Sequence, residues 1–393
     1  MTAAGSRDWL RVALGMFIIA FGANLFAPLL PSYRLHAGLG QSQVTFLLAI
    51  YVAGLLPALL IGGPVSDIRG RRALIRPALL LSALGSVVLA SGATGSFTAL
   101  WSGRLIAGIA MGLVMAAGAA WLQELSTGPA HLGPRRATVA LSLGFAGGPL
   151  AAGAIAEFLP RPDLLPYLVH LALLALITPL VWRTPGGAAR TDGLRRSRFS
   201  RSVLSGRFLW GTAIWAPWGF GTVSTAFATL TALVNDSLTW PVAFTGLIAA
   251  VTLGTGVLIQ PVATRLDARR FPPAVPGLLL VVAGMCAAAG VAVTRSPGLV
   301  FPAAILLGAA YGVLMVSGLQ EVQRIAPARE LGAATAVFYS LTYLGFFAPF
   351  LLSHLGPALG YPEAFLAGAG IAAASVAPVL WVRGRGSSRR PGR

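Results

Sequence analysis

Residues 63–72 read GPVSDIRGRR and separate two apolar runs, residues 43–62 and 73–93. Each run is about as long as the roughly 20 apolar residues that an α-helix needs to cross a bilayer. Gly70 permits a tight backbone between the runs. The carboxylate of Asp67 lies close enough in sequence to the three arginines to be neutralised by them. The stretch predicts two membrane helices joined by a very short charged turn.

The composition of the whole chain supports this interpretation. Of the 393 residues, 56% are hydrophobic and 10% are charged, whereas soluble domains carry about 25% charged residues. A soluble chain of this length would form two or three domains with polar surfaces, and this chain has too little charge to cover them. We therefore predict an all-α, polytopic membrane protein.

Apolar runs recur along the chain, bounded by clusters of Arg, Pro and Gly. They predict twelve transmembrane helices, at residues 11–33, 43–62, 73–93, 97–121, 137–158, 165–182, 208–233, 242–262, 273–293, 298–319, 331–352 and 362–382. The first run resembles a signal peptide in its position. Because more apolar runs follow it, we predict that it is retained as the first span.

The arginines predict the orientation. The net charge is +18, and every basic residue is Arg. With a cytoplasmic N-terminus, 25 of the 29 arginines fall in cytoplasmic segments; the exceptions are Arg34, Arg161 and Arg295 outside, and Arg104 within a span. This asymmetry follows the positive-inside rule and predicts a multi-pass protein of the cell (plasma or inner) membrane with both termini cytoplasmic. Anionic lipid headgroups then explain the basic charge, and no nucleic-acid partner is expected.

The two halves of the chain resemble each other at an offset of about 197 residues. Leu122-Gln123-Glu124 matches Leu319-Gln320-Glu321, and Ala137-Thr138 matches Ala334-Thr335. An even number of spans in each half gives both halves the same orientation, which predicts two pseudo-symmetric six-helix bundles related by an axis along the membrane normal. The predicted parts are an N-terminal bundle at 1–183, a cytoplasmic linker at 184–206, a C-terminal bundle at 207–383 and a basic cytoplasmic tail at 384–393.

The charged turn resembles the G-x-x-x-D-R-x-G-R-R loop of the major facilitator superfamily. The chain keeps Gly63, Asp67, Gly70, Arg71 and Arg72 of that pattern. Ile68 stands where the family has a basic residue, and Arg69 is a candidate substitute. The resemblance implies a cytoplasmic latch between the halves, in which Asp67 holds the outward-facing state at the start of span eleven. Glu124, at the cytoplasmic end of span four, is the expected partner of Arg71.

Arg104 lies about seven residues into the fourth predicted span, roughly 10 Å deep at 1.5 Å per residue. A charge at this depth costs about 2.5–3.5 kcal/mol on insertion scales, so such a residue usually faces a cavity and has a function. The alternative is that Arg104 snorkels to the outer headgroups. The family has a similar R-x-x-x-G pattern here, matched by Arg104 and Gly108, which implies a role in substrate or proton coupling.

The fifth predicted span resembles the G-x-x-x-G-P pattern of the antiporter branch of the family. The matching residues are Gly144, Gly148, Pro149 and Gly153. The alternative is ordinary helix packing, because small residues let helices approach closely. The resemblance favours efflux over uptake.

The resemblance also places spans one, four, seven and ten around a central cavity. The candidate residues for substrate or proton coupling are Arg104, Asn24, Trp215, Trp218, Thr222, Tyr311 and Tyr343. Aromatic side chains suit a broad, apolar substrate that needs few fixed hydrogen bonds. The tryptophans could equally serve ordinary packing.

No acidic residue lies in the middle of a predicted span. Export of cationic drugs in exchange for protons often relies on a buried carboxylate. We therefore expect a neutral or anionic substrate, and proton coupling rests on the resemblance. His170, near the start of span six, is a second titratable candidate or a packed histidine.

These observations predict a monomeric secondary active transporter. It would export small, largely apolar neutral or anionic molecules, such as antibiotics or metabolites, by proton antiport with alternating access. The alternative is an uptake permease for a sugar, an organic acid or another small metabolite. The sequence has no HExxH, GxSxG or Walker A motif, so we predict no enzyme activity, no cofactor and no metal site. The expected partners are the substrate, the proton and membrane lipid.

Overall fold

The computed structural model describes residues 7–126, 132–186, 200–267, 274–327 and 330–387. These residues form helices, turns and short connections, and no strand occurs among them. The chain folds into two compact units. Unit 1 comprises Met1–Leu194 with Trp240–Ala250, and unit 2 comprises Arg195–Thr239 with Val251–Arg393. The segment Trp240–Ala250 thus groups with unit 1 although it follows the first part of unit 2 in the sequence.

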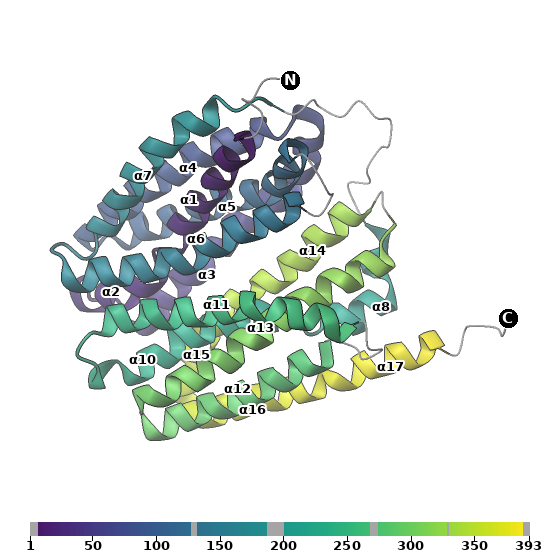
Figure 1. Ribbon diagram of the computed structural model, residues 1–393. Coiled ribbons are helices and arrows are strands. Elements are labelled where there is room, and N and C mark those ends of the chain that lie inside the picture. The colour runs from purple at the N-terminus through teal and green to yellow at the C-terminus, as the bar shows by residue number, and fades with distance from the viewer. Residues whose placement is uncertain (1–6, 127–131, 187–199, 268–273, 328–329, 388–393) are drawn as a thin grey trace. The chain divides into compact units, whose positions relative to one another are not determined.

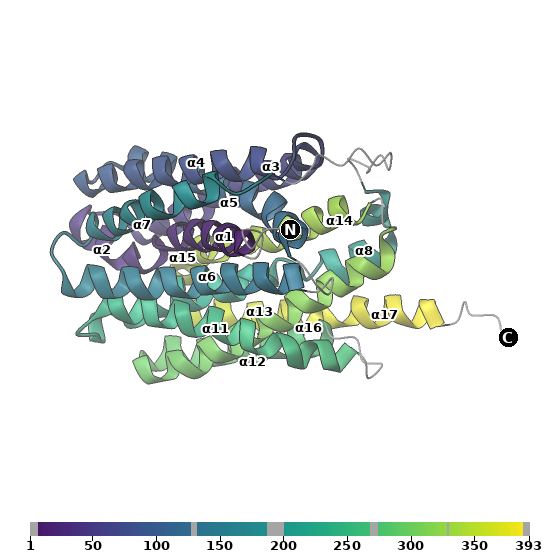
Figure 2. The ribbon, with the colours of Figure 1, turned by 45° about the horizontal axis from the view of Figure 1, so that its top comes forward.

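Apart from Trp240–Ala250, unit 1 is a bundle of long helices, coloured purple to teal in Figure 1. Its elements are α1 (Asp8–Asn24), η2 (Ala27–Leu29), α2 (Leu30–His36), α3 (Gln41–Arg69), α4 (Arg72–Ser91), η3 (Gly92–Thr94), α5 (Phe97–Leu125), α6 (Leu132–Phe158) and α7 (Leu165–Trp182). The helices α4 and α7 run side by side along one flank of the unit (Figures 1 and 2).

Unit 2 repeats this plan with more interruptions. Its elements are η4 (Arg201–Leu204), α8 (Gly206–Phe208), η5 (Leu209–Ala213), α9 (Trp218–Ser224), η6 (Thr225–Leu230), α10 (Thr231–Val234), η7 (Asn235–Ser237), most of α11 (Pro241–Asp267), α12 (Ala274–Thr294), α13 (Pro297–Ile325), α14 (Leu331–Tyr343), η8 (Leu344–Phe347), α15 (Ala348–Leu359), α16 (Tyr361–Ala374) and α17 (Val376–Ser387). The helices α12 and α16 pack along each other (Figure 1).

Eleven helical segments of the described residues are long and apolar enough to cross a membrane. They match eleven of the twelve predicted spans, and most are longer at their ends than predicted. The remaining prediction, residues 208–233, is helical but broken into short α and π pieces around a turn before α9. Pro217 lies in this turn, and because proline has no N–H and clashes with the preceding turn of a helix, it interrupts the segment.

Glycine brings the second and fourth spans of each unit into backbone contact. In unit 1, a Cβ at Gly108 of α5 would overlap the carbonyl oxygen of Tyr51 in α3. In unit 2, a Cβ at Gly312 of α13 would overlap the carbonyl oxygen of Gly256 in α11. The same pair of spans is therefore packed in the same way in both units, which agrees with the internal repeat.

Candidate functional site

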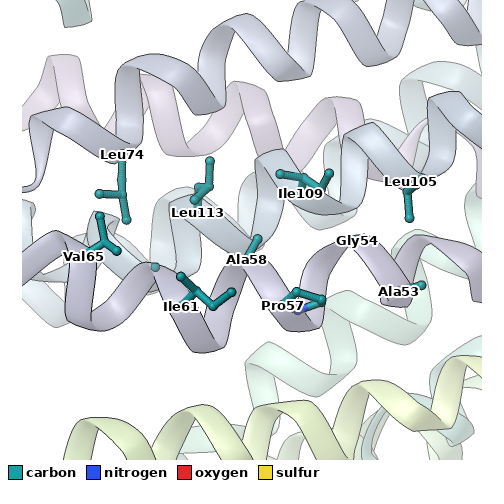
Figure 3. Close-up of a pocket in the computed structure, with 11 residues that line it drawn as sticks. Ala53, Gly54, Pro57, Ala58, Ile61, Val65, Leu74, Leu105, Ile109 and Leu113 are labelled. Atoms are coloured by element: carbon teal, nitrogen blue, oxygen red, sulfur yellow. The ribbon is translucent and has the colours of Figure 1, made fainter. Parts of the chain in front are cut away.

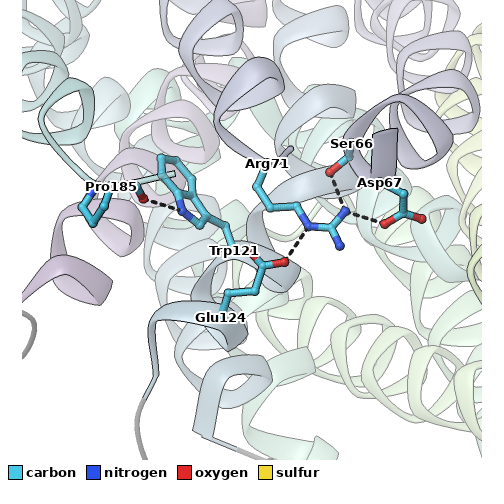
Figure 4. Close-up of polar contacts among 6 residues, drawn as sticks. All are labelled: Ser66, Asp67, Arg71, Trp121, Glu124 and Pro185. Atoms are coloured by element: carbon cyan, nitrogen blue, oxygen red, sulfur yellow. Dashed lines mark hydrogen bonds and ion pairs between the residues drawn. The ribbon is translucent and has the colours of Figure 1, made fainter. Parts of the chain in front are cut away.

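Arg71 is the centre of a charged cluster at the turn between α3 and α4 (Figure 4). Its Nη1 donates to Oδ1 of Asp67 at 2.6 Å and to Oγ of Ser66 at 2.8 Å. Its Nε donates to Oε1 of Glu124 at 3.0 Å. Arg71 is only 6% exposed, so two carboxylates neutralise a largely buried guanidinium. The ion pair between Arg71 and Glu124 that the sequence suggested is present.

The other residues of the turn have separate surroundings. Gly70 has a φ of 83°, a conformation that favours glycine, and it lets the chain pass directly from α3 into α4. No described atom lies within 4 Å of a Cβ built at Gly63. Arg72 does not join the cluster, and its Nη2 instead donates to the carbonyl oxygen of Trp182 at 3.1 Å. The latch function of these residues stays a prediction.

Arg104 of α5 is 2% exposed and bonds to three backbone carbonyl oxygens. Its Nε donates to Leu47 at 3.1 Å, its Nη1 to Ala23 at 3.0 Å and its Nη2 to Leu48 at 3.3 Å. None of the carboxylates in the described ranges forms an ion pair with it. The hydrogen bonds of the guanidinium thus tie α5 to α1 and α3 through backbone carbonyl oxygens.

Two aromatic rings enclose the same guanidinium. Its central carbon lies 4.6 Å from the centroid of the Phe26 ring and 4.5 Å from that of Tyr51, distances that suit cation–π attraction. The helix α1 ends at Asn24, and Pro28 in the following turn has no N–H to offer the carbonyl oxygens of this break. The Nη1 of Arg104 supplies one donor there, to the carbonyl oxygen of Ala23. The side chain of Asn24 bonds its own helix, from Nδ2 to the carbonyl oxygen of Ala20 at 3.0 Å.

The motif of the fifth span lies on α6 and consists of Gly144, Gly148, Pro149 and Gly153. Two of these glycines contact the backbone of α1: a Cβ at Gly148 would overlap the carbonyl oxygen of Phe21, and Gly144 meets that of Phe17. A Cβ at Gly153 would lie 3.1 Å from the Cα of Gly246, in the part of α11 that groups with unit 1. The motif is a two-sided packing surface in this structure, and its antiporter role stays a prediction.

The predicted residues of unit 2 are Trp215, Trp218, Thr222, Tyr311 and Tyr343. Tyr311 and Tyr343 come together at Phe220, with ring centroids 5.2 and 4.3 Å from it. The sequence analysis did not select Phe220, because one phenylalanine among nineteen carries no distinguishing signal. The structure thus joins two predicted residues in an aromatic cluster.

The remaining three residues, Trp215, Trp218 and Thr222, have their contacts elsewhere. Trp215 is 1% exposed and donates from Nε1 to the carbonyl oxygen of Gly211 at 2.5 Å. Thr222 is fully buried, and its hydroxyl donates to the carbonyl oxygen of Gly219 at 2.9 Å. Trp218 is half-buried and approaches Gly368. The donors of Trp215 and Thr222 are thus used within their own helical segment.

The structure also places a carboxylate that the sequence analysis did not select. Asp163, in the connection before α7, is 8% exposed. Its Oδ1 accepts from Oγ of Ser32 at 2.6 Å, and its Oδ2 lies 3.0 Å from Nδ1 of His36. Asp163 lies outside the middle of any predicted span, so its position in the sequence offered no reason to select it. Its burial is determined by the fold of the α6–α7 connection.

His170 of α7 joins three helices of unit 1. Its Nε2 lies 3.0 Å from the carbonyl oxygen of Ile18, which can only accept, so Nε2 carries the proton. Its Nδ1 lies 2.7 Å from the hydroxyl of Ser86, which can donate to it. A Cβ at Gly22 would overlap the ring. Both ring nitrogens are satisfied in the neutral form, so His170 is a packed histidine in this structure.

An apolar pocket of about 470 Å³ lies on unit 1, and Figure 3 shows side chains of α3 and α5 facing each other across it. Its lining is Ala53, Gly54, Pro57, Ala58, Ile61, Gly62, Val65, Leu74, Leu105, Ile109 and Leu113. No lining residue carries an ionisable or hydrogen-bonding side chain. None of the residues selected from the sequence as substrate-binding lines it.

The fold and these sites define a polytopic membrane transporter built from two helical units. The family model of the Major Facilitator Superfamily matches residues 12–349, and the chain belongs to this superfamily. The family and the structural neighbours are membrane transporters and not enzymes.

Two curated relatives match parts of the chain. The Quinolone resistance protein NorA of Staphylococcus aureus (strain N315) is 26% identical over 184 residues, which are 46% of each chain. The facilitated glucose transporter member 10 of solute carrier family 2 from Danio rerio is 36% identical over 98 residues, 25% of this chain and 19% of the relative. The chain thus matches less than half the length of either relative.

Two solved structures share the whole fold. The nucleoside transporter NupG superimposes with a TM-score of 0.75 at 11% identity, covering 95% of this chain and 99% of NupG. The peptide transporter POT superimposes with a TM-score of 0.77 at 14% identity, covering 96% of this chain and 94% of POT. At these identities the likeness concerns the fold alone.

Proposed function

We propose that this chain exports small, largely apolar neutral or anionic molecules in exchange for protons. The observation that carries the proposal is the apolar pocket of unit 1, whose eleven lining residues offer no charge and no side-chain hydrogen bond. Such a lining recognises shape and apolar surface, which suits a broad set of apolar compounds. It offers a cation no counter-charge.

The direction of transport rests on two further observations. The relative with the longer match carries the name of a quinolone resistance protein, which favours export of antibiotic-like compounds. The glycine and proline motif of α6 resembles the antiporter branch, and its residues lie where α6 contacts α1. We place the protein in the cell membrane as a monomer, with both termini in the cytoplasm.

Two clusters have proposed roles in alternating access. The Arg71 cluster joins Arg71 to Asp67 and Glu124 by ion pairs at one end of α3, α4 and α5. A latch that opens and closes once per transport cycle needs ion pairs of this kind, which can break and form again. Arg104 of α5 would couple movement of the first span to α3 and α5, because it bonds α1 at Ala23 and α3 at Leu47.

The second candidate function is uptake of a small metabolite. The match to a facilitated glucose transporter over 98 residues favours it, and the same fold carries nucleoside and peptide transporters. An uptake permease for a polar metabolite would need hydrogen-bonding side chains around its substrate. The apolar pocket provides none.

A susceptibility panel with a pocket variant tests the proposal. Cells that lack their own exporters would express the chain and be exposed to quinolones and other antibiotics of differing charge. Export should raise the inhibitory concentration of apolar, neutral or anionic compounds. Ala53→Phe fills the pocket and should lower this protection about tenfold.

Ala73→Phe is the matched control for that variant. Ala73 is exposed on α4 and does not line the pocket, so the same substitution there should leave protection unchanged. Full protection by Ala53→Phe would remove the pocket from the proposal. Absence of protection for every compound, with better growth on a limiting nutrient, would favour uptake.

A further inference from the structure

Two arginines of α4 converge on one backbone oxygen at the end of α7. Nη2 of Arg72 lies 3.1 Å from the carbonyl oxygen of Trp182, and Nη2 of Arg76 lies 2.5 Å from the same oxygen. The two nitrogens can therefore be no farther apart than the sum of these distances. The guanidinium of Arg76 also lies 4.6 Å from the centroid of the Trp182 ring.

This pair of charges is not neutralised within the described parts of the chain. No carboxylate of those residues forms an ion pair with Arg72 or Arg76. The neighbouring Arg71, by contrast, has both Asp67 and Glu124. The two guanidiniums repel each other, and a single carbonyl at a helix C-terminus carries only a partial negative charge.

The hydrogen-bonding capacity of the pair is also largely unused. Each guanidinium has five N–H donors in a fixed fork. One described acceptor, the carbonyl oxygen of Trp182, serves both arginines, and the Nε of each is buried without a partner. The contacts to Trp182 are exposed, so another molecule can reach the tips of both side chains. The bond to the end of α7 uses one N–H donor of each arginine, and the other donors at the tips of the two guanidiniums are available to a ligand.

We propose that Arg72 and Arg76, with the indole of Trp182, bind an anionic phosphate group at the end of α4 and α7. Guanidinium forks match the oxygens of phosphate in pairs, and two forks side by side provide the charge for one phosphate. Trp182 is 38% exposed at the last residue of its span, a position typical of the membrane interface. Basic pockets between membrane helices bind lipid headgroups in this way.

The phosphate can come from an anionic phospholipid or from solution. Thermal unfolding of the purified full chain in detergent distinguishes the sources. The midpoint would be measured with phosphatidylglycerol, with phosphatidylcholine, and with inorganic phosphate against sodium chloride of equal ionic strength. Phosphatidylcholine serves as the comparison because its own choline cation offsets the phosphate charge.

The variants are a double substitution in the site and a matched double substitution outside it. Arg72→Gln with Arg76→Gln removes both forks, and about tenfold more phosphatidylglycerol should then be needed for half of the stabilisation. Arg69→Gln with Arg135→Gln removes the same net charge from two exposed arginines at the same end of unit 1, and the wild-type response should remain. If the site variant fails to fold, Arg76→Lys keeps the charge and removes one fork, and it should weaken the response by a smaller factor.

Saturable stabilisation of the wild type by phosphatidylglycerol alone would identify a lipid headgroup site. Stabilisation by inorganic phosphate as well would show that the site accepts free phosphate. Both outcomes support the proposal when the site variant loses the response and the control keeps it. Equal loss in both variants, or no preference of the wild type for either phosphate source over its comparison, would overturn it.

Discussion

The guanidinium of Arg104 is held by three carbonyl oxygens and two aromatic rings. Its depth in the fourth span predicted a residue that faces a cavity or snorkels to the headgroups, and in the structure the side chain instead bonds the backbone of α1 and α3. The identity of the partners could not be predicted, because every residue has a carbonyl oxygen and only the break after α1 makes that of Ala23 available. The burial of Asp163 could not be predicted either, because it depends on the path of the α6–α7 connection.

Arg104→Ala should abolish export while the protein still inserts into the membrane. The substitution leaves three carbonyl oxygens without their donor and opens a cavity between two rings, and we expect a stability loss of about 2–4 kcal/mol. Membrane yield, the thermal midpoint and export would be measured together. Arg104→Lys retains the charge without the guanidinium fork, and its export and thermal midpoint should lie between those of the wild type and Arg104→Ala. Normal export by Arg104→Ala would contradict the role assigned to this residue.

At the scale of elements, small residues decide how closely the helices pack. The glycine spacing in the fourth and fifth spans was visible in the sequence, and the structure uses it for backbone contact between α5 and α3 and between α6 and α1. The sequence could not show which glycines of a span make contact, because that depends on the rotation of each helix. The break around Pro217 could not be predicted from apolar composition, which indicated one continuous span at residues 208–233.

Neighbouring glycines of α6 provide a test of this packing. A Cβ at Gly148 would overlap the carbonyl oxygen of Phe21, whereas a Cβ at Gly147 would have its nearest neighbour, a ring carbon of Phe21, at 3.9 Å. Gly148→Ala should therefore destabilise the protein by about 1–3 kcal/mol. Gly147→Ala should be neutral or stabilising by up to about 1 kcal/mol, because alanine favours the helix. Thermal unfolding in detergent measures both, and equal effects would refute the assigned contact.

At the scale of the whole molecule, charge and hydropathy predicted most of the architecture. Eleven of the twelve predicted spans are helical segments of sufficient length and hydropathy, and the family is the one that the charged turn suggested. The apolar pocket could not be predicted, because its lining combines residues from three helices whose rotation the sequence does not specify. The separation of Arg72 from the Arg71 cluster likewise depends on where α7 ends.

Accumulation of a quinolone in cells that lack their own exporters tests the central claim most directly. Cells that express the chain should hold less of the compound than cells with an empty vector, and the difference should vanish when a protonophore dissipates the pH gradient. Greater accumulation in the expressing cells would contradict export. A difference that survives the protonophore would contradict proton antiport.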